Sequence, residues 1–195
     1  RPGLNALMEV AGRRRAELSA QDLGFALGPR LNAAGRLDDI SLGIQCLLTE
    51  DAEQAMNTAR ALDELNQDRK LIEQDMQREA LKIVEQIPLS LEGEIPPALC
   101  LFQPEWHQGV VGLLASRIKE KYHRPVIAFA RGDNGQLKGS SRSIPGLHIR
   151  DALDAVATQN PGLISKFGGH AMAAGLSLDE DKLPAFKEAF QRQVA

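Results

Sequence analysis

The chain has 195 residues, 43% of them hydrophobic, and a formal net charge of -3 at pH 7. A chain of this size and apolar content can bury the core of one or two domains. The slightly acidic balance excludes a protein that binds nucleic acid through its overall charge, so such binding must use local basic clusters. Cys46 and Cys100 lie far apart in apolar surroundings, which predicts reduced core thiols. With no apolar run of membrane-spanning length, we expect a cytoplasmic protein without membrane contact.

The first fifty residues are predicted to be helical. Apolar residues at helical spacing predict a short helix that ends at Gly12. Ser19 and Asp22 have the spacing of a capping box, and the helix that they begin is expected to stop by Gly28-Pro29.

The longest predicted element begins at Asp51 and Gln54. Apolar residues recur at helical spacing over 55–87, which predicts one helix that runs to Pro88 and is about 50 Å long. Its middle, residues 66–70, is polar, so we expect an exposed connector between two bodies. A lone coiled coil is the alternative.

After a linker over 90–97, the sequence changes to short apolar runs. Residues 98–102 and 125–130 are predicted strands with a helix between them, which is a βαβ unit with parallel strands. The more polar run 136–143 is expected to be a strand nearer an edge. The remaining predicted elements are a helix over 148–158, a strand over 176–178 and a helix over 183–194. We therefore predict an α/β protein: a helical N-terminal segment (1–50), a long connector helix (51–88) and a small α/β domain with a mixed, partly parallel sheet (89–195).

Three glycines, three alanines and a histidine gather in residues 167–175. The pair Gly168-Gly169 precedes a predicted helix, where free amide N–H groups can point at an anion, and His170 can donate to the same group. A tight turn into a small-residue helix that packs on a neighbour is the alternative.

A second cluster, residues 138–143, holds three serines, a lysine and an arginine. In a strand Ser140 and Arg142 share one face, and a guanidinium fork with a hydroxyl suits phosphate. A solvated edge strand is the alternative.

Two further motifs carry candidate ligand-binding residues. His107 follows the only Trp at the start of a predicted helix that contains two glycines, where either an anion or a neighbouring helix would need close approach. Arg30 and Arg36 flank small residues, and Asp38 or Asp39 is expected to pair with Arg36 and to help cap the helix after Ser41. No P-loop, HExxH, CxxC or GxSxG motif is present, and no Asp/His cluster has metal-ligand spacing.

Taken in order, four of these motifs resemble the DHH phosphoesterase superfamily, and within it the bacterial single-stranded-DNA exonucleases of repair and recombination. They are 28–37, 106–117, 139–143 and 168–175. The resemblance implies a bilobal hydrolase that cleaves phosphodiesters from 5′ to 3′ and uses Mn²⁺ or Mg²⁺ bound by an Asp-His-His lobe. The Asp-His-His triplet is missing here. Residues 1–50 would then be the end of that lobe and 89–195 the DHH-associated domain, and this piece by itself is expected to bind no metal and to be inactive.

The resemblance also implies roles for individual residues. Ser140 and Arg142 would bind the 5′-phosphate, and the implied partner is single-stranded DNA with a 5′ end, with repair proteins such as single-stranded-DNA-binding protein as further candidates. The other residues implied in substrate binding or near the scissile group are Arg30, Arg36, His107, Gly168, Gly169 and His170. Two alternatives stay open: a DHH phosphodiesterase that acts on short oligonucleotides or cyclic dinucleotides, and a non-enzymatic module that binds a partner through the middle of the long helix.

Overall fold

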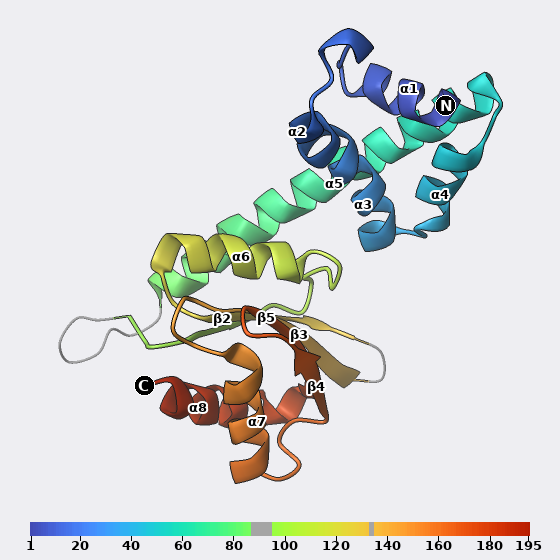
Figure 1. Ribbon diagram of the computed structural model, residues 1–195. Coiled ribbons are helices and arrows are strands. Elements are labelled where there is room, and N and C mark those ends of the chain that lie inside the picture. The colour runs from blue at the N-terminus through green and yellow to red at the C-terminus, as the bar shows by residue number, and fades with distance from the viewer. Residues whose placement is uncertain (87–94, 133–134) are drawn as a thin grey trace. The chain divides into compact units, whose positions relative to one another are not determined.

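A computed structural model describes residues 1–86, 95–132 and 135–195 (Figure 1). The chain forms two compact units, Arg1–Ile72 and Glu73–Ala195. The long helix α5 (Ala52–Glu85) contributes to both units. Its predicted end at Pro88 and most of the predicted linker lie outside the described residues. Across the described part of the chain, no helix has the length and apolar character needed to cross a membrane.

The first unit is helical, as predicted. Its core includes Leu7, Ala34 and Cys46, packed against the first half of α5. The capping box at Ser19 is present, because the Asp22 N–H donates to the Ser19 hydroxyl and the Ser19 N–H donates to the Asp22 carboxylate. Its elements before α5 are α1 (Pro2–Val10), η1 (Arg15–Glu17), α2 (Ala20–Asp22), η2 (Leu23–Leu27), α3 (Gly28–Leu37) and α4 (Ser41–Leu48).

The expected helix stop at Gly28-Pro29 is wrong. The chain stays helical through Leu37, with one wide turn (η2) in which the Gly28 N–H donates to the carbonyl of Leu23. Pro29 then falls in the first turn of α3. A proline is tolerated there because the first N–H groups of a helix lack an intrahelical acceptor, so its missing N–H costs nothing.

The second unit is built on a five-stranded sheet with the order β1-β2-β3-β5-β4. The pair β1 and β2 is parallel, with α6 as its crossover, and every other pair is antiparallel. The predicted βαβ unit and mixed sheet are confirmed. The strands are β1 (Leu99–Phe102), β2 (Val126–Arg131), β3 (Gln136–Arg142), β4 (Lys166–Gly169) and β5 (Ala173–Asp179); the helices are α6 (Val111–Tyr122), α7 (Ile149–Gln159), η4 (Glu180–Lys182) and α8 (Leu183–Val194).

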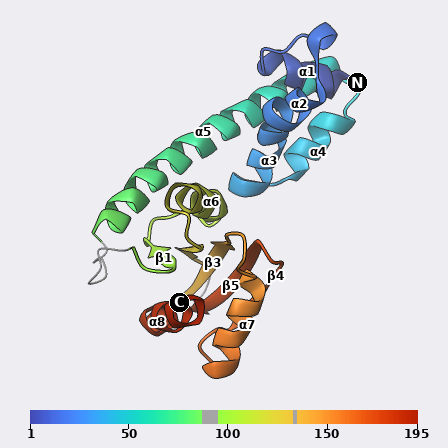
Figure 2. The ribbon, with the colours of Figure 1, turned by 60° about the vertical axis from the view of Figure 1, so that its left-hand side comes forward.

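The two faces of this sheet are covered differently. Helix α6 lies on one face and α7 and α8 lie on the other (Figures 1 and 2). The α7/α8 face holds an aromatic cluster in which the rings of Phe129 and Phe190 each lie 5.7 Å from the ring of Phe186. On the other side, the second half of α5 is joined to the α6 segment by the bond from the Trp106 indole N–H to Glu79, at 2.8 Å.

Two sequence-based expectations in this unit are wrong. Strand β3 is the centre of the sheet and not near an edge. The run 171–175 is not a helix, because β4 and β5 form a hairpin in which β5 pairs with β3 along its whole length. Pairing with the central strand overrides the helix propensity of the alanines.

Both cysteines are free and buried, as predicted. Burial raises the pKa of the Cys100 thiol to about 12, and it also raises the pKa of Cys46. A protonated thiol is a poor nucleophile, so neither cysteine is suited to chemistry.

The close packing around Gly139 predicts that a side chain at this position destabilises the protein. A Cβ there would lie 2.6 Å from Phe129 Cε1 and 2.7 Å from Leu176 Cδ2. We expect Gly139→Ala to lower the free energy of unfolding by about 1–3 kcal/mol, measured by urea denaturation. Gly175→Ala on the adjacent strand is the control, because its Cβ would lie 3.8 Å from the nearest atom. Equal stability of the two variants would contradict this packing.

Candidate substrate-binding site

Ser140 and Arg142 share the α6 face of β3, as predicted from their spacing. A Cβ on Gly112 of α6 would lie 2.9 Å from Nη2 of Arg142 and 3.5 Å from Oγ of Ser140. Both side chains therefore lie against the first turns of α6. They can come this close because Gly112 has no side chain. This explains why α6 contains a glycine, although glycine destabilises a helix by up to about 1 kcal/mol relative to alanine.

The guanidinium of Arg142 is oriented by hydrogen bonds. Its Nε donates to Oγ of Ser116 at 3.1 Å, and its Nη1 donates to the carbonyl of Ser141 at 2.8 Å. The Ser116 hydroxyl in turn donates to the carbonyl of Gly112 at 3.1 Å. A half-buried arginine held in this way loses little side-chain entropy when it binds an anion. Sequence alone does not reveal this role of Ser116, because only the three-dimensional fold brings it to Arg142.

The other two serines of the cluster serve the fold. The Ser141 hydroxyl donates to the carbonyl of Ala174 at 2.7 Å and accepts from its N–H at 3.1 Å. The Ser143 hydroxyl donates to the carbonyl of Leu147 at 2.7 Å. Both serines are fully buried, and these bonds satisfy their hydroxyls. Ser140 is thus the serine of this cluster that shares a face with Arg142.

The glycine-histidine motif forms the end of the β4–β5 hairpin. Gly169 has a φ of 145°, and a Cβ there would lie 2.4 Å from Cα of Ala174, so the turn itself requires glycine. His170 is exposed, and its backbone N–H donates to the carbonyl of Ala173 at 2.8 Å. Ala173 pairs with Arg142, which places the turn and the guanidinium at the same end of the sheet.

His107 lies in a turn before α6 and not in the helix, which begins at Val111. The Nδ1 atom accepts from the N–H of Gly109 at 3.1 Å, and the backbone carbonyl accepts from Val110 at 3.0 Å. The expectation that this segment opens the helix is therefore wrong by about one turn. The Nδ1 atom of the imidazole is therefore engaged within the turn.

Arg30 and Arg36 lie on α3, in the first unit. Arg30 forms an ion pair with Asp63 at 2.8 Å and donates to the carbonyl of Ala26 at 2.6 Å, which holds α3 to α5. Asp39 accepts from the N–H of Ser41 at 2.8 Å, and this bond lowers the pKa of the Asp39 carboxyl. Asp39 thus helps to satisfy the start of α4 by accepting from its first N–H, although the N-cap position itself is Ile40, which makes no side-chain capping bond.

Asp38 and Asp39 are adjacent carboxylates, so a metal ion there would need further ligands beside them in space. Within residues 1–86, 95–132 and 135–195, no group of three His, Cys, Asp or Glu side chains is placed to hold a metal ion. Asp38 and Asp39 thus have no third candidate ligand beside them in the described structure.

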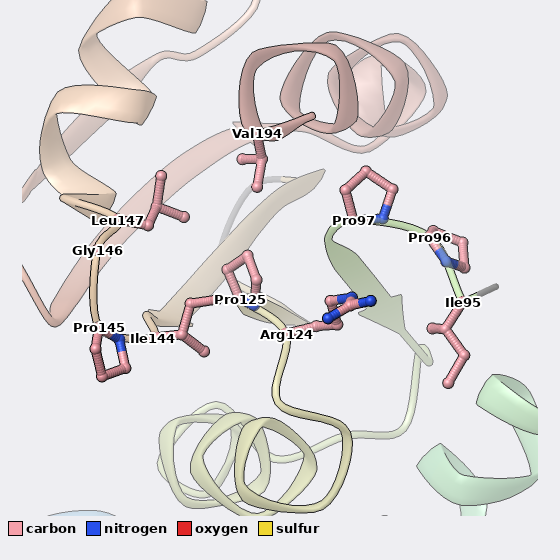
Figure 3. Close-up of a pocket in the computed structure, with 10 residues that line it drawn as sticks. All are labelled: Ile95, Pro96, Pro97, Arg124, Pro125, Ile144, Pro145, Gly146, Leu147 and Val194. Carbon is pink, nitrogen blue, oxygen red and sulfur yellow. The ribbon is translucent and has the colours of Figure 1, made fainter.

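A large hollow in the second unit is of a different kind. It has a volume of about 590 Å³ and is lined by prolines and aliphatic side chains, with Arg124 as the charged residue among those described (Figure 3). Its described lining contains Pro96, Pro125 and Pro145 but no hydroxyl or carboxylate side chain. Such a lining offers few polar groups to orient a phosphate ester, so the candidate site is the Ser140–Arg142 face.

The fold and these motifs define a known class of domain. The family model described as "DHHA1 domain" matches residues 96–195, which is more than half of the chain. The chain belongs to this family.

Over nearly its whole length, the chain is also similar to one kind of nuclease. It is 60% identical, over 194 residues, to the single-stranded-DNA-specific exonuclease RecJ of Escherichia coli (strain K12), and it covers 33% of that protein. A crystal structure of RecJ from Thermus thermophilus in complex with Mg²⁺ matches 99% of this chain and 28% of that chain, with a TM-score of 0.84 and 34% identity. A structure of exonuclease RecJ bound to manganese matches 99% of this chain and 45% of that chain, with a TM-score of 0.80 and 35% identity. The chain spans about a third of the length of curated RecJ relatives such as those of Escherichia coli and Dickeya dadantii.

The bond network around Arg142 predicts the effect of Ser116→Ala. This change removes the acceptor of the Arg142 Nε–H, so the group should exchange faster with water and its resonance should shift in ¹H–¹⁵N NMR spectra. Arg131 is the internal control, because its Nε donates to Glu180 at 3.0 Å and should be unaffected. An unchanged Arg142 resonance would contradict the network.

Proposed function

We propose that this chain is the substrate-holding part of a RecJ-type, metal-dependent exonuclease that degrades single-stranded DNA from its 5′ end. The observation that carries the proposal is the Ser140–Arg142 pair against Gly112 of α6, a prearranged guanidinium and hydroxyl on one face. A planar guanidinium binds two phosphate oxygens at once, and a hydroxyl can serve a third. The sequence similarity to RecJ, which extends over the whole chain, supports the same function.

In this proposal Ser140 and Arg142 hold the terminal 5′-phosphate. The backbone near the scissile group is held by His107 and by the hairpin residues Gly168, Gly169 and His170. Arg36 contributes from the first unit, and Arg30 acts indirectly, because its ion pair with Asp63 anchors α3.

The catalytic centre of the longer protein belongs to a part outside this chain. Residues 1–50 would be the end of the catalytic lobe, 51–88 the connector and 89–195 the DHH-associated domain. Mg²⁺ or Mn²⁺ would supply a metal-activated water there, as the ions in the RecJ structures suggest. We further propose that the longer protein acts in the cytoplasm in DNA repair and recombination. Its partners there would be repair proteins such as single-stranded-DNA-binding protein.

The test is fluorescence anisotropy with a labelled single-stranded oligonucleotide at low salt, with and without a 5′-phosphate. Wild type should prefer the phosphorylated strand, and Arg142→Ala should remove that preference, with a loss of roughly ten-fold or more for a bidentate charged contact. Arg142→Lys should restore only part of it, because an ammonium lacks the planar fork.

Arg150→Ala is the matched control, because Arg150 is exposed on α7, one of the two helices on the opposite face of the sheet. A nuclease assay with Mn²⁺ on the same samples should show no cleavage. Equal affinity for both strands in wild type and Arg142→Ala would overturn the phosphate assignment. Nuclease activity that co-purifies with the chain would overturn the proposal that the catalytic centre lies outside it.

A further inference from the structure

Two hydrogen bonds tie the second half of α5 to the segment that carries α6, and the two helices pass beside each other there (Figures 1 and 2). The Trp106 indole N–H donates to Oε2 of Glu79 at 2.8 Å, and Nε of Arg117 donates to Oε1 of Glu73 at 3.3 Å. These residues all belong to the second unit. We call the pairs Glu79–Trp106 and Glu73–Arg117 the α5 clamp.

The two contacts of the clamp lie at different points along both helices. Glu73 and Glu79 are six residues apart on α5, which is about 9 Å at 1.5 Å per residue. On the other side, Trp106 lies before α6 begins, and Arg117 lies inside it. A single contact would let α6 pivot about it. Two separated contacts fix both its position along α5 and its rotation about its own axis.

Each partner of the clamp is adjacent in sequence to a residue of the candidate site. Trp106 directly precedes His107, and Arg117 directly follows Ser116. The Ser116 hydroxyl accepts from Nε of Arg142 at 3.1 Å. Because the peptide bond that joins neighbouring residues is planar and stiff, a displacement of Trp106 or Arg117 carries the next residue with it.

Burial makes these contacts more than surface pairs. Trp106 is 3% exposed and Glu73 is 8% exposed. A buried indole N–H without an acceptor is unfavourable, so Glu79 holds the tryptophan in one orientation. Met76 and Ala80 are buried as well, and positions 73, 76 and 80 follow one stripe of a helix. This stripe of α5 therefore faces protein and not solvent.

The position of α6 in turn decides how Arg142 is presented. A Cβ on Gly112 would lie 2.9 Å from Nη2 of Arg142, so the backbone of α6 is already close to the guanidinium. A hydrogen bond weakens when its donor and acceptor move apart by a few tenths of an ångström, so a small shift of α6 would loosen the bond from Arg142 to Ser116. Binding of phosphate by the guanidinium fork is directional and would weaken with it.

We propose that Glu73 and Glu79 are positioning residues of the phosphate site. Through Arg117 and Trp106 they hold α6 in place, and α6 keeps the guanidinium of Arg142 aimed at the 5′-phosphate. Both glutamates carry the same sign of charge as phosphate and act only through their partners. This inference rests on the proposed function, and it adds α5 to a site that is otherwise built from the sheet and α6.

The first test separates the hydrogen bond at position 79 from its charge. Glu79→Ala removes the acceptor of the indole N–H. The preference for a 5′-phosphorylated over an unphosphorylated single strand, measured by anisotropy, should fall roughly three- to five-fold. Glu79→Gln keeps a side-chain carbonyl that can accept from the indole and should restore most of the preference. Glu85→Ala is the matched control, because it removes the same charge from an exposed position on the same helix.

The second test reports the position of the guanidinium itself. The Nε–H resonance of Arg142 in ¹H–¹⁵N NMR spectra should shift in Glu79→Ala and in Glu73→Ala, while that of Arg131 stays unchanged. Trp106→Phe keeps an apolar ring but lacks the N–H, so Glu79→Ala should have little further effect in that background. All measurements are made well below the melting temperature of each variant, so that unfolded protein does not contribute.

The outcomes separate this inference from the proposed function. An unchanged phosphate preference and an unchanged Arg142 resonance in both alanine variants of the clamp would overturn the positioning role and leave the proposed function standing. An equal change of preference in Glu79→Ala and Glu85→Ala would reflect charge alone and would also overturn it. No phosphate preference in the wild-type chain would overturn the proposed function; an unchanged Arg142 resonance beside it would overturn the positioning role as well.

Discussion

The close approach of α6 to β3 at Gly112 is the contact on which the candidate site depends. Any side chain larger than hydrogen at this position would meet the guanidinium of Arg142. The same turn of α6 supplies the Gly112 carbonyl that orients Ser116, and Ser116 accepts from Nε of Arg142. One backbone contact therefore sets both the distance and the orientation of the cation, and the arginine reaches the surface already in place.

Strand β3 faces the buried core on one side and the candidate site on the other. It can do so because successive side chains of a strand point to opposite faces of the sheet. Leu137, Gly139 and Ser141 are buried on the α7/α8 side, while Lys138, Ser140 and Arg142 lie on the α6 side. The buried serine is tolerated because its hydroxyl both donates to and accepts from Ala174, on the neighbouring strand. A central strand is held by partners on both sides, so it is a rigid base for the polar side chains that it carries.

Local patterns predict much of this fold and the shared face of Ser140 and Arg142. They fail where a long-range partner decides the outcome. The polarity of residues 136–143 suggests an edge, whereas it arises from one face of a central strand. The alanines at 171–174 favour a helix, but pairing of β5 with β3 governs them. Pairing between strands distant in sequence leaves no periodic mark in either strand, so only the assembled sheet reveals it.

The glycines show most clearly what sequence leaves open. Gly139, Gly168, Gly169 and Gly175 look alike in the sequence, yet the first and third are required by packing or by backbone geometry, and the other two are not. The net charge of the chain likewise does not reveal the local charge at the candidate site. The chain as a whole is acidic, but exposed charges beyond about 8–10 Å are screened at physiological salt. An anion at the Ser140–Arg142 pair would therefore respond mainly to the guanidinium of Arg142, so a protein of net charge -3 can still present a surface suited to phosphate.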